Sequence, residues 1–133
     1  MRLTLQTDFA LRILMTLAKT PGEVRSVEEI ATYFDLSHHH LMKTAQALAR
    51  SGFIKTTRGR SGGIMLKQDA NAITVGAVVR AIEPDLRMAE CFQANQKGTK
   101  CALLPSCKLK PVLGEALFEF LAVLDNKKLS EII

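Results

Sequence analysis

Residues 26–66, SVEEIATYFDLSHHHLMKTAQALARSGFIKTTRGRSGGIML, hold two short helical patterns and then an alternating, glycine-rich pattern. Ser26 and Glu29 form a capping box, which marks the start of the first helix. After a tight turn, Ser37 is placed to cap a second helix over His38–Arg50. Two short helices joined in this way, the second with a polar outer face, are typical of a helix-turn-helix.

The segment after this pair of helices predicts a β-hairpin. Residues 53–57 alternate and are rich in β-branched side chains, and residues 64–66 form a second apolar run. Between them, residues 58–63 read RGRSGG, a basic turn whose glycines allow a tight reversal of the chain. A helix-turn-helix followed by such a hairpin predicts a winged helix with the basic turn at the tip of its wing.

The rest of the chain is mostly helical in pattern. Apolar residues recur every three or four positions over Leu5–Lys19, Ile73–Ile82 and Leu109–Leu124, which predicts three further helices. A short terminal helix is expected within residues 126–133. The expected fold class is therefore mainly α: a winged helix-turn-helix with a two-stranded wing, a cysteine-containing loop and a long C-terminal helix.

All three cysteines lie in a segment without strong periodicity, residues 84–107. A loop of this length inside a compact domain usually has a function. We therefore expect a winged-helix domain over residues 1–83, a functional loop over 84–107, and a dimerisation helix with a tail over 108–133. The long helix carries an apolar stripe wide enough to pack against a second copy or against its own domain. The stripe consists of Leu113, Leu117, Phe120 and Leu124.

The charge of the chain is unevenly distributed. The 133 residues carry a formal net charge of +5. Residues 1–67 contain ten Lys and Arg against five Asp and Glu, whereas residues 68–133 contain eight against eight. No acidic residue lies between Asp35 and Asp69. A basic half joined to a neutral half suggests a polyanion-binding module, with a plain solvated basic face as the alternative.

The sequence also indicates in which cellular compartment the protein is expected to work. No apolar stretch approaches the roughly 18 residues that span a bilayer, so no membrane association is expected. Asp8 and Arg12 interrupt the N-terminal apolar pattern, which disfavours a signal peptide and predicts a cytoplasmic protein. Because thiols stay reduced there, clustered cysteines indicate metal or redox chemistry before disulfides.

The candidate DNA contacts lie at the start of the second helix and at the wing tip. A recognition helix reads base edges with residues near its N-terminus, and arginine is favoured in a narrow minor groove. Glycine beside the wing arginines lets the backbone approach the duplex closely. The predicted DNA-binding residues are Ser37, His38, His39, His40 and Lys43 on the helix, and Arg58, Arg60 and Gly62 on the wing.

The three consecutive histidines have two other interpretations, a metal site and a remnant of an expression tag. A tag would lie at a terminus, and His38, His39 and His40 lie in the middle of the domain. Adjacent residues of a helix point about 100° apart, so three rings in a row do not converge on one ion. DNA contact remains the favoured role.

The three cysteines are the strongest chemical signal. Cys91, Cys101 and Cys107 have the spacing C-x9-C-x5-C, without the CxxC pair of a zinc ribbon or a thioredoxin motif. Three thiolates in one irregular segment suit an iron–sulfur cluster and leave one coordination position for a weaker ligand. A structural zinc site, redox sensing by the thiols alone and three unconnected thiols stay open. A cysteine-nucleophile enzyme is disfavoured, because no histidine lies near these residues in sequence and no phosphate-binding glycine loop is present.

Taken together, these motifs resemble a family of bacterial winged-helix regulators with three cysteines. The family includes NsrR-type nitric-oxide-sensing repressors, IscR-type iron–sulfur cluster regulators and RirA-type iron regulators. The resemblance covers almost the whole chain. It rests on residues 1–4 with Thr7 and Asp8, on the wing at 57–64, on 73–79, and on the three cysteines leading into Lys108 and Leu109.

The resemblance implies a cofactor and its ligands. In NsrR-type members, an aspartate in the first helix of the partner subunit completes the iron–sulfur cluster, and Asp8 matches that position. The cluster is expected to be 4Fe–4S, with 2Fe–2S as the alternative. IscR-type members use a histidine three residues past the last cysteine, where this chain has Lys110. An i,i+4 ion pair between Asp8 and Arg12 on the helix surface is the plainer role for Asp8.

The resemblance also implies partners and a signal. A homodimer paired through the 109–124 helix would place two recognition helices on a palindromic operator in double-stranded DNA. Nitric oxide is the expected effector, and its reaction with the cluster would release the repressor from DNA. Because residues 88–92 are similar to the iron regulators, iron status is the alternative signal. A structural-zinc protein that binds nucleic acid constitutively is the alternative of another class.

Overall fold

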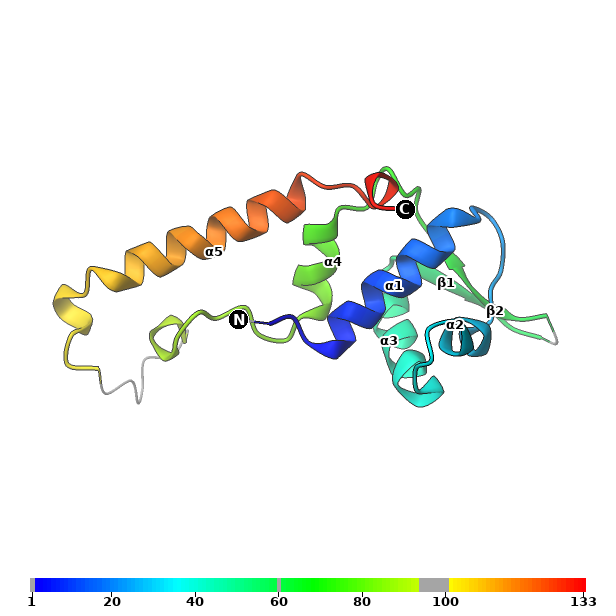
Figure 1. Cartoon of the computed structure of the whole chain (residues 1–133), viewed down its shortest axis with the longest axis horizontal. Helices are drawn as coiled ribbons and strands as arrows, with labels where there is room; N and C mark the ends of the chain where they lie inside the picture. Colours follow the sequence, from blue (N-terminus) through cyan, green and yellow to red (C-terminus); the bar gives the residue numbers. More distant parts are fainter. Residues whose placement is uncertain (1, 60, 94–100) are drawn as a thin grey trace.

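The computed structural model describes residues 2–59, 61–93 and 101–133. A head built from four helices and a two-stranded sheet lies at one end, and one long helix, α5, extends away from it (Figure 1). The head is the expected winged helix-turn-helix, so the predicted fold class is confirmed. The helices are α1 (Leu5–Lys19), α2 (Val27–Tyr33), α3 (His38–Arg50), α4 (Val75–Ile82) and α5 (Leu109–Asp125); the strands are β1 (Ile54–Thr57) and β2 (Gly63–Leu66); short 3-10 turns are η1 (Glu90–Phe92), η2 (Leu104–Ser106) and η3 (Leu129–Glu131).

Local signals place α2 and α3. The Ser26 hydroxyl accepts a hydrogen bond from the Glu29 amide at 3.0 Å, and the Glu29 carboxylate accepts one from the Ser26 amide at 3.3 Å. This reciprocal pair is the capping box that the sequence predicts. The turn between the helices places Asp35 in the left-handed region at φ 52°, which aspartate tolerates better than most residues. The helix-turn-helix therefore follows from its own local sequence.

The wing is an antiparallel hairpin tied back to the head. Ile54 pairs with Leu66 and Thr57 with Gly63. Beyond the hairpin, Ile64 and Arg25 exchange two backbone hydrogen bonds of 2.9 Å, so the segment before α2 pairs with β2. These bonds hold the base of the wing against the helix-turn-helix and fix the direction in which its tip points.

The hydrophobic core lies inside the head, around α1. Ile13 and Leu14 are fully buried, and α1 packs against both α3 and α4. Leu41 and Leu48 bring α3 into the same core. Burying an aliphatic side chain of this size contributes about 1.5–3 kcal/mol, so α3 is firmly seated with its opposite face left outside.

The C-terminal tail returns to the head instead of forming the expected terminal helix. Leu129 is buried, and its amide donates to the Ile73 carbonyl oxygen at 2.8 Å. Thr74 and Lys128 form an antiparallel bridge. This backbone pairing explains two differences from the prediction: α4 begins at Val75 rather than Ile73, and the tail contains only the 3-10 turn Leu129–Glu131.

A second contact joins α4 to the C-terminal end of α5. The Arg80 guanidinium donates two hydrogen bonds to the Asp125 carboxylate, one of them 2.7 Å long. These bonds raise the pKa of Arg80 above its usual value. Gly76 allows the close approach, because a Cβ there would lie 2.8 Å from the backbone nitrogen of Asp125. The head and the long helix are therefore connected through a tight, glycine-dependent junction.

Along its length, α5 is the least covered helix. None of its residues is buried, and the expected stripe at residues 113, 117, 120 and 124 is only half-buried. Other large apolar side chains are open to solvent: Leu109, Val112, Phe118 and Val123. In the described parts of the chain, no helix is long and apolar enough to cross a membrane.

Candidate functional site

The first turn of α3 presents the predicted DNA-reading residues. Ser37, His38, His39, His40 and Lys43 are all exposed. Ser37 occupies the N-cap position of α3, but its hydroxyl makes no capping hydrogen bond among the described residues, so the predicted side-chain cap is wrong. Hydroxyl, imidazole and ammonium groups at the N-terminal end of such a helix can reach base edges and phosphates.

The opposite face of α3 is held by the core. Thr44 is buried, and its hydroxyl donates to the His40 carbonyl oxygen at 2.9 Å. With Leu41 and Leu48 also buried, the helix has one packed face and one polar face. A rigid inner face is what allows the outer side chains to be presented in a defined register to a DNA groove.

The three histidines do not form a metal site. The rings of His39 and His40 lie 6.1 Å apart, centroid to centroid, and are tilted by 53°. Over residues 2–59, 61–93 and 101–133, no group of three or more His, Cys, Asp or Glu side chains is arranged to hold a metal ion. Contact of the three histidines with DNA stays a prediction.

At the wing tip, Arg58 is exposed and Gly59 has φ 112°, a conformation that favours glycine. The Gly62 amide donates to the Gly59 carbonyl oxygen at 3.0 Å, and a Cβ on Gly62 would lie 2.5 Å from the Thr57 carbonyl oxygen. Gly62 is thus required by the turn itself, and its contact with DNA stays a prediction. Arg60, also predicted to bind DNA, lies outside the described residues.

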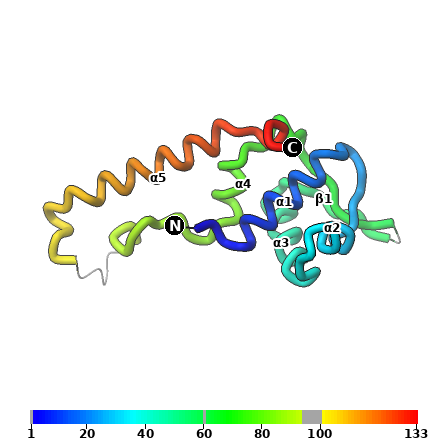
Figure 2. The backbone as a smooth tube through the Cα atoms, in the orientation of Figure 1, coloured from blue at the N-terminus to red at the C-terminus, as the bar shows by residue number. Residues whose placement is uncertain are grey.

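The cysteine segment, residues 84–107, leaves the head after α4 and ends at the start of α5. Cys91 lies in η1, and Cys107 lies two residues before α5 begins. The neighbour Phe92 packs near Gly114, and the Lys110 ammonium lies 5.9 Å from the Phe92 ring centroid. Figure 2 shows the chain running from the foot of α4 toward the end of α5 that lies far from the wing, where residues 101–107 lead into the helix.

The donor set fits an iron–sulfur cluster in its chemistry. Cys91, Cys101 and Cys107 are free thiols, Cys101 is exposed, and none is taken up by the core. Cys107 lies near the start of α5 through its position in the chain, and the contacts of Phe92 with Lys110 and Gly114 place the neighbouring Cys91 toward the same end. In the described single chain the three sulfurs are not gathered into a metal-binding group. Their assembly around a cofactor is therefore a proposal, taken up below.

Asp8 forms the ion pair that the sequence left as the plainer possibility. Its carboxylate lies 2.8 Å from the Arg12 guanidinium, with both side chains partly exposed. Arg12 also lies over the Phe34 ring, 5.6 Å from its centroid, and so links α1 to the end of α2. Ligation of a partner's cluster by Asp8 stays a prediction, because it concerns a second subunit.

One residue that sequence reasoning missed joins the start of α1 to the end of α4. The Glu83 carboxylate accepts hydrogen bonds from the Thr7 hydroxyl at 2.6 Å, the Thr4 amide at 3.1 Å and the Thr4 hydroxyl at 3.2 Å. Thr7 is fully buried. Glu83 therefore fixes where α1, with Asp8, starts relative to the segment that leads to Cys91. No local pattern could reveal this contact, because Thr7 and Thr4 lie 76 and 79 residues before Glu83 in the chain.

The turn at residues 85–87, at the start of the cysteine segment, is also held by hydrogen bonds. Arg87 donates to the Asp85 carboxylate from its side chain, at 2.6 Å from Nη2, and from its backbone amide at 2.8 Å. The side-chain bonds, and then the backbone bond, lower the pKa of Asp85 to about 2. The chain therefore leaves the head through an ordered turn before it reaches the cysteines.

We expect Glu83→Ala to destabilise the head. The substitution removes the carboxylate that accepts hydrogen bonds from the Thr7 hydroxyl and from the Thr4 amide and hydroxyl, which costs about 1–3 kcal/mol in the free energy of unfolding. Glu83→Gln keeps one carbonyl oxygen as an acceptor and should cost less. Urea unfolding followed by circular dichroism measures both. Glu119→Ala, an exposed carboxylate on α5, is the control, and an equal effect there would contradict this role for Glu83.

Comparison with known proteins gives consistent matches over nearly the whole chain. The family model described as "Rrf2: Iron-dependent Transcriptional regulator" matches residues 3–133. The HTH-type transcriptional regulator NsrR of Bacillus subtilis strain 168 is 44% identical over 134 aligned residues, which cover all of this chain and 90% of the relative. The regulator of the same name from Geobacillus kaustophilus strain HTA426 is 42% identical with the same coverage.

Solved structures share the fold. CymR of B. subtilis, described as its global cysteine regulator, superposes with a TM-score of 0.74 at 26% identity, covering 99% of this chain and 95% of that one. IscR of T. potens superposes with a TM-score of 0.75 at 21% identity, covering 99% and 85%. The second likeness concerns the fold alone.

Proposed function

Since the chain belongs to the Rrf2 family of iron-dependent transcriptional regulators, we propose that it represses transcription and senses nitric oxide through an iron–sulfur cluster bound by Cys91, Cys101 and Cys107. Family membership makes the protein a transcriptional regulator and not an enzyme. The observation that carries the finer proposal is full-length similarity to NsrR regulators in a chain that has these three cysteines together with Asp8.

The head is the part of the protein that we propose binds DNA. The exposed first turn of α3 would enter the major groove, with Lys43 and Arg58 among the groups that contact phosphates. Each phosphate contact contributes about −0.9 to the slope of log affinity against log salt concentration. Acting on chromosomal DNA, the protein would work in the cytoplasm.

A second copy of the chain is the proposed occupant of the apolar surface of α5. The exposed Leu109, Val112, Phe118 and Val123 are costly to leave in water on a helix whose other face is only half-buried. A two-fold dimer through α5 would cover them and would hold two heads at the spacing of a palindromic site. The half-buried stripe at Leu117 and its neighbours would be completed in the same interface.

The cysteine segment would connect the dimer to its signal. A bound cluster, expected to be 4Fe–4S, would supply iron for reaction with nitric oxide. Cys91, Cys101 and Cys107 would hold it near the far end of α5, and Asp8 of the partner subunit is proposed as the fourth ligand. Bound in this way, Asp8 would tie α1 of one head to the cysteine segment of the other. In each chain, Glu83 joins α1 to the segment that leads to the cysteines. Release of Asp8 from the cluster would therefore change how the two heads are held relative to each other.

Iron status is the second candidate signal, favoured by the family description and by residues 88–92. One experiment separates the alternatives: gel-shift titration of anaerobically purified protein with a palindromic operator, with and without nitric oxide and with and without an iron chelator. Loss of binding with nitric oxide supports the proposal, and loss with the chelator alone supports the iron-responsive alternative. A colourless protein that contains zinc and binds DNA under all four conditions would overturn both.

Asp8 and Arg12 allow ligation to be separated from ion pairing. We expect Asp8→Ala to make the visible absorbance of the cluster decay faster in air and to weaken the response to nitric oxide. Arg12→Gln breaks the same ion pair but keeps the carboxylate, so it should leave the cluster in place. Absorbance decay and gel shifts on both variants are the measurements. Equal behaviour of the two variants would reduce Asp8 to an ion-pair partner.

A further inference from the structure

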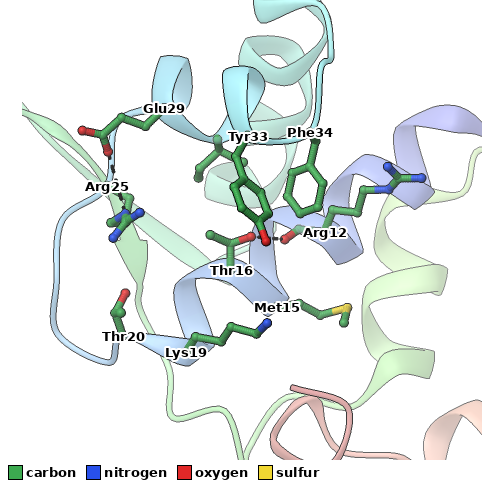
Figure 3. Close-up of a pocket in the computed structure, with 10 residues that line it drawn as sticks. Arg12, Met15, Thr16, Lys19, Thr20, Arg25, Glu29, Tyr33 and Phe34 are labelled. Carbon is green, nitrogen blue, oxygen red and sulfur yellow. Dashed lines mark hydrogen bonds and ion pairs between the residues drawn. The ribbon is translucent and has the colours of Figure 1, made fainter.

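A cavity of about 330 Å³ lies between α1 and α2, away from the cysteines and from the first turn of α3 (Figure 3). Its volume is near the lower end of the roughly 300–1,000 Å³ found for small-molecule sites. Met15, Ile30, Tyr33 and Phe34 form an apolar wall. Neither the DNA-binding surface nor the cysteine segment accounts for this cavity.

The polar side of the cavity is rich in cations. Arg12, Lys19 and Arg25 line it, with Glu29 as the carboxylate among the lining residues. The Arg25 guanidinium is not tightly paired: its nitrogens lie 3.7 Å from Glu29 and 3.9 Å from a Glu23 oxygen. Both distances exceed those of a hydrogen bond. Because Arg12 is paired with Asp8, the lining cations that would meet an anion are Lys19 and the loosely paired Arg25.

Two donors in this lining lack an acceptor. Arg25 Nε and Thr20 Oγ1 are buried atoms without a hydrogen-bond partner among the described residues. A buried donor without a partner costs about 1–3 kcal/mol, more when it is charged, so such groups call for an explanation. Because these two atoms are buried, the part of Arg25 open to a ligand is the exposed portion of its guanidinium, and an anion with oxygen acceptors is the group that would pair with it.

The apolar wall selects the rest of the ligand. Tyr33 remains 77% exposed, and its ring meets Phe34 edge to face at a centroid distance of 4.9 Å. Figure 3 shows Tyr33 extending from α2 toward α1, with Arg25 and Thr20 on one side and Phe34 and Arg12 on the other. An aromatic ring placed against Tyr33 would bury this exposed surface.

We propose that the α1–α2 cavity binds a small aromatic carboxylate, with its carboxylate on the Arg25 guanidinium and its ring against Tyr33. Lys19 adds long-range attraction for the anion. Binding here does not depend on the cluster.

Benzoate is the probe, and full-length, anaerobically purified protein is titrated with it by calorimetry. Tyrosine fluorescence gives a second readout, because Tyr33 is the single tyrosine of the chain and tryptophan is absent. We expect saturable binding of benzoate and at least about tenfold weaker binding of benzamide, which lacks the charge. Saturation by inorganic phosphate with equal affinity would overturn the aromatic part of the proposal.

Variants locate the site. Arg25→Gln should weaken benzoate binding about tenfold, as expected for the loss of a charge-assisted hydrogen bond. Tyr33→Ala, at an exposed position that tolerates truncation, should weaken it as well, measured by calorimetry. Arg50→Gln removes a guanidinium from the exposed end of α3 and should leave binding unchanged. An equal loss in Arg50→Gln, or the absence of saturable heat with the wild-type protein, would overturn the proposal. Calorimetry detects benzoate binding in the absence of DNA and nitric oxide. Its result therefore does not depend on whether the protein senses nitric oxide.

Discussion

Cys107→Ser should abolish iron and sulfide binding and lower operator affinity at least about 100-fold in anaerobically purified protein. A near-complete switch between DNA-bound and released protein requires roughly a 10⁴-fold difference in operator affinity between the cluster-bound and cluster-free states. The expected loss of affinity in Cys107→Ser lies within that range. Serine is close to cysteine in size but is a poor ligand for the iron of such a cluster. Cys107 is also the cysteine nearest to α5, where the cysteine segment meets the proposed dimer interface.

Iron and sulfide analysis, visible absorbance and gel shifts measure the effect of Cys107→Ser. Ser106→Ala, at the exposed neighbouring position in η2, is the matched control and should leave all three unchanged. Circular dichroism of both variants checks that α5 still forms. Full operator affinity in a Cys107→Ser protein that contains no iron would remove the cluster from the mechanism and leave a winged helix that binds DNA without it.

Gly76→Ala should destabilise the protein by about 1–3 kcal/mol, the usual cost of overpacking a close contact. The added Cβ would overlap the Asp125 carboxylate and would lie 2.8 Å from the Asp125 backbone nitrogen. The side chain can rotate away, but only by giving up its hydrogen bonds with Arg80, and the backbone can move only if α4 and α5 separate. The junction between the head and the long helix would therefore loosen.

Gly114→Ala is the matched control for Gly76→Ala, because both glycines lie inside helices. At Gly114 the nearest atom to an added Cβ is on the Phe92 ring at 3.8 Å, an ordinary contact. Helix propensity then decides the outcome, and Gly114→Ala should stabilise the protein by up to about 1 kcal/mol. Urea unfolding of the two variants should give shifts of opposite sign. A stabilising Gly76→Ala would show that α4 and α5 do not need their close approach.

The helix-turn-helix could be read from the sequence because its signals are local. The capping box at Ser26 and Glu29 satisfies amide groups only three residues apart, and the apolar spacing of α3 fixes which face meets the core. The wing could be predicted for the same reason, since it consists of two short strands joined by a glycine-rich turn. The described candidate contacts on α3 and Arg58 on the wing are exposed, and their contact with DNA stays a prediction.

The sequence alone determined the winged-helix head, the long C-terminal helix and the presence of three thiols in one irregular segment, because periodicity, capping and turn chemistry act over a few residues. Only the tertiary structure decided that Glu83 holds Thr4 and Thr7, that the tail pairs with Ile73, and that Arg25 and Tyr33 line one cavity. Each of these depends on residues far apart in the chain meeting when the core packs. No local pattern encodes such a meeting, since the same side chains would satisfy the same local rules without it.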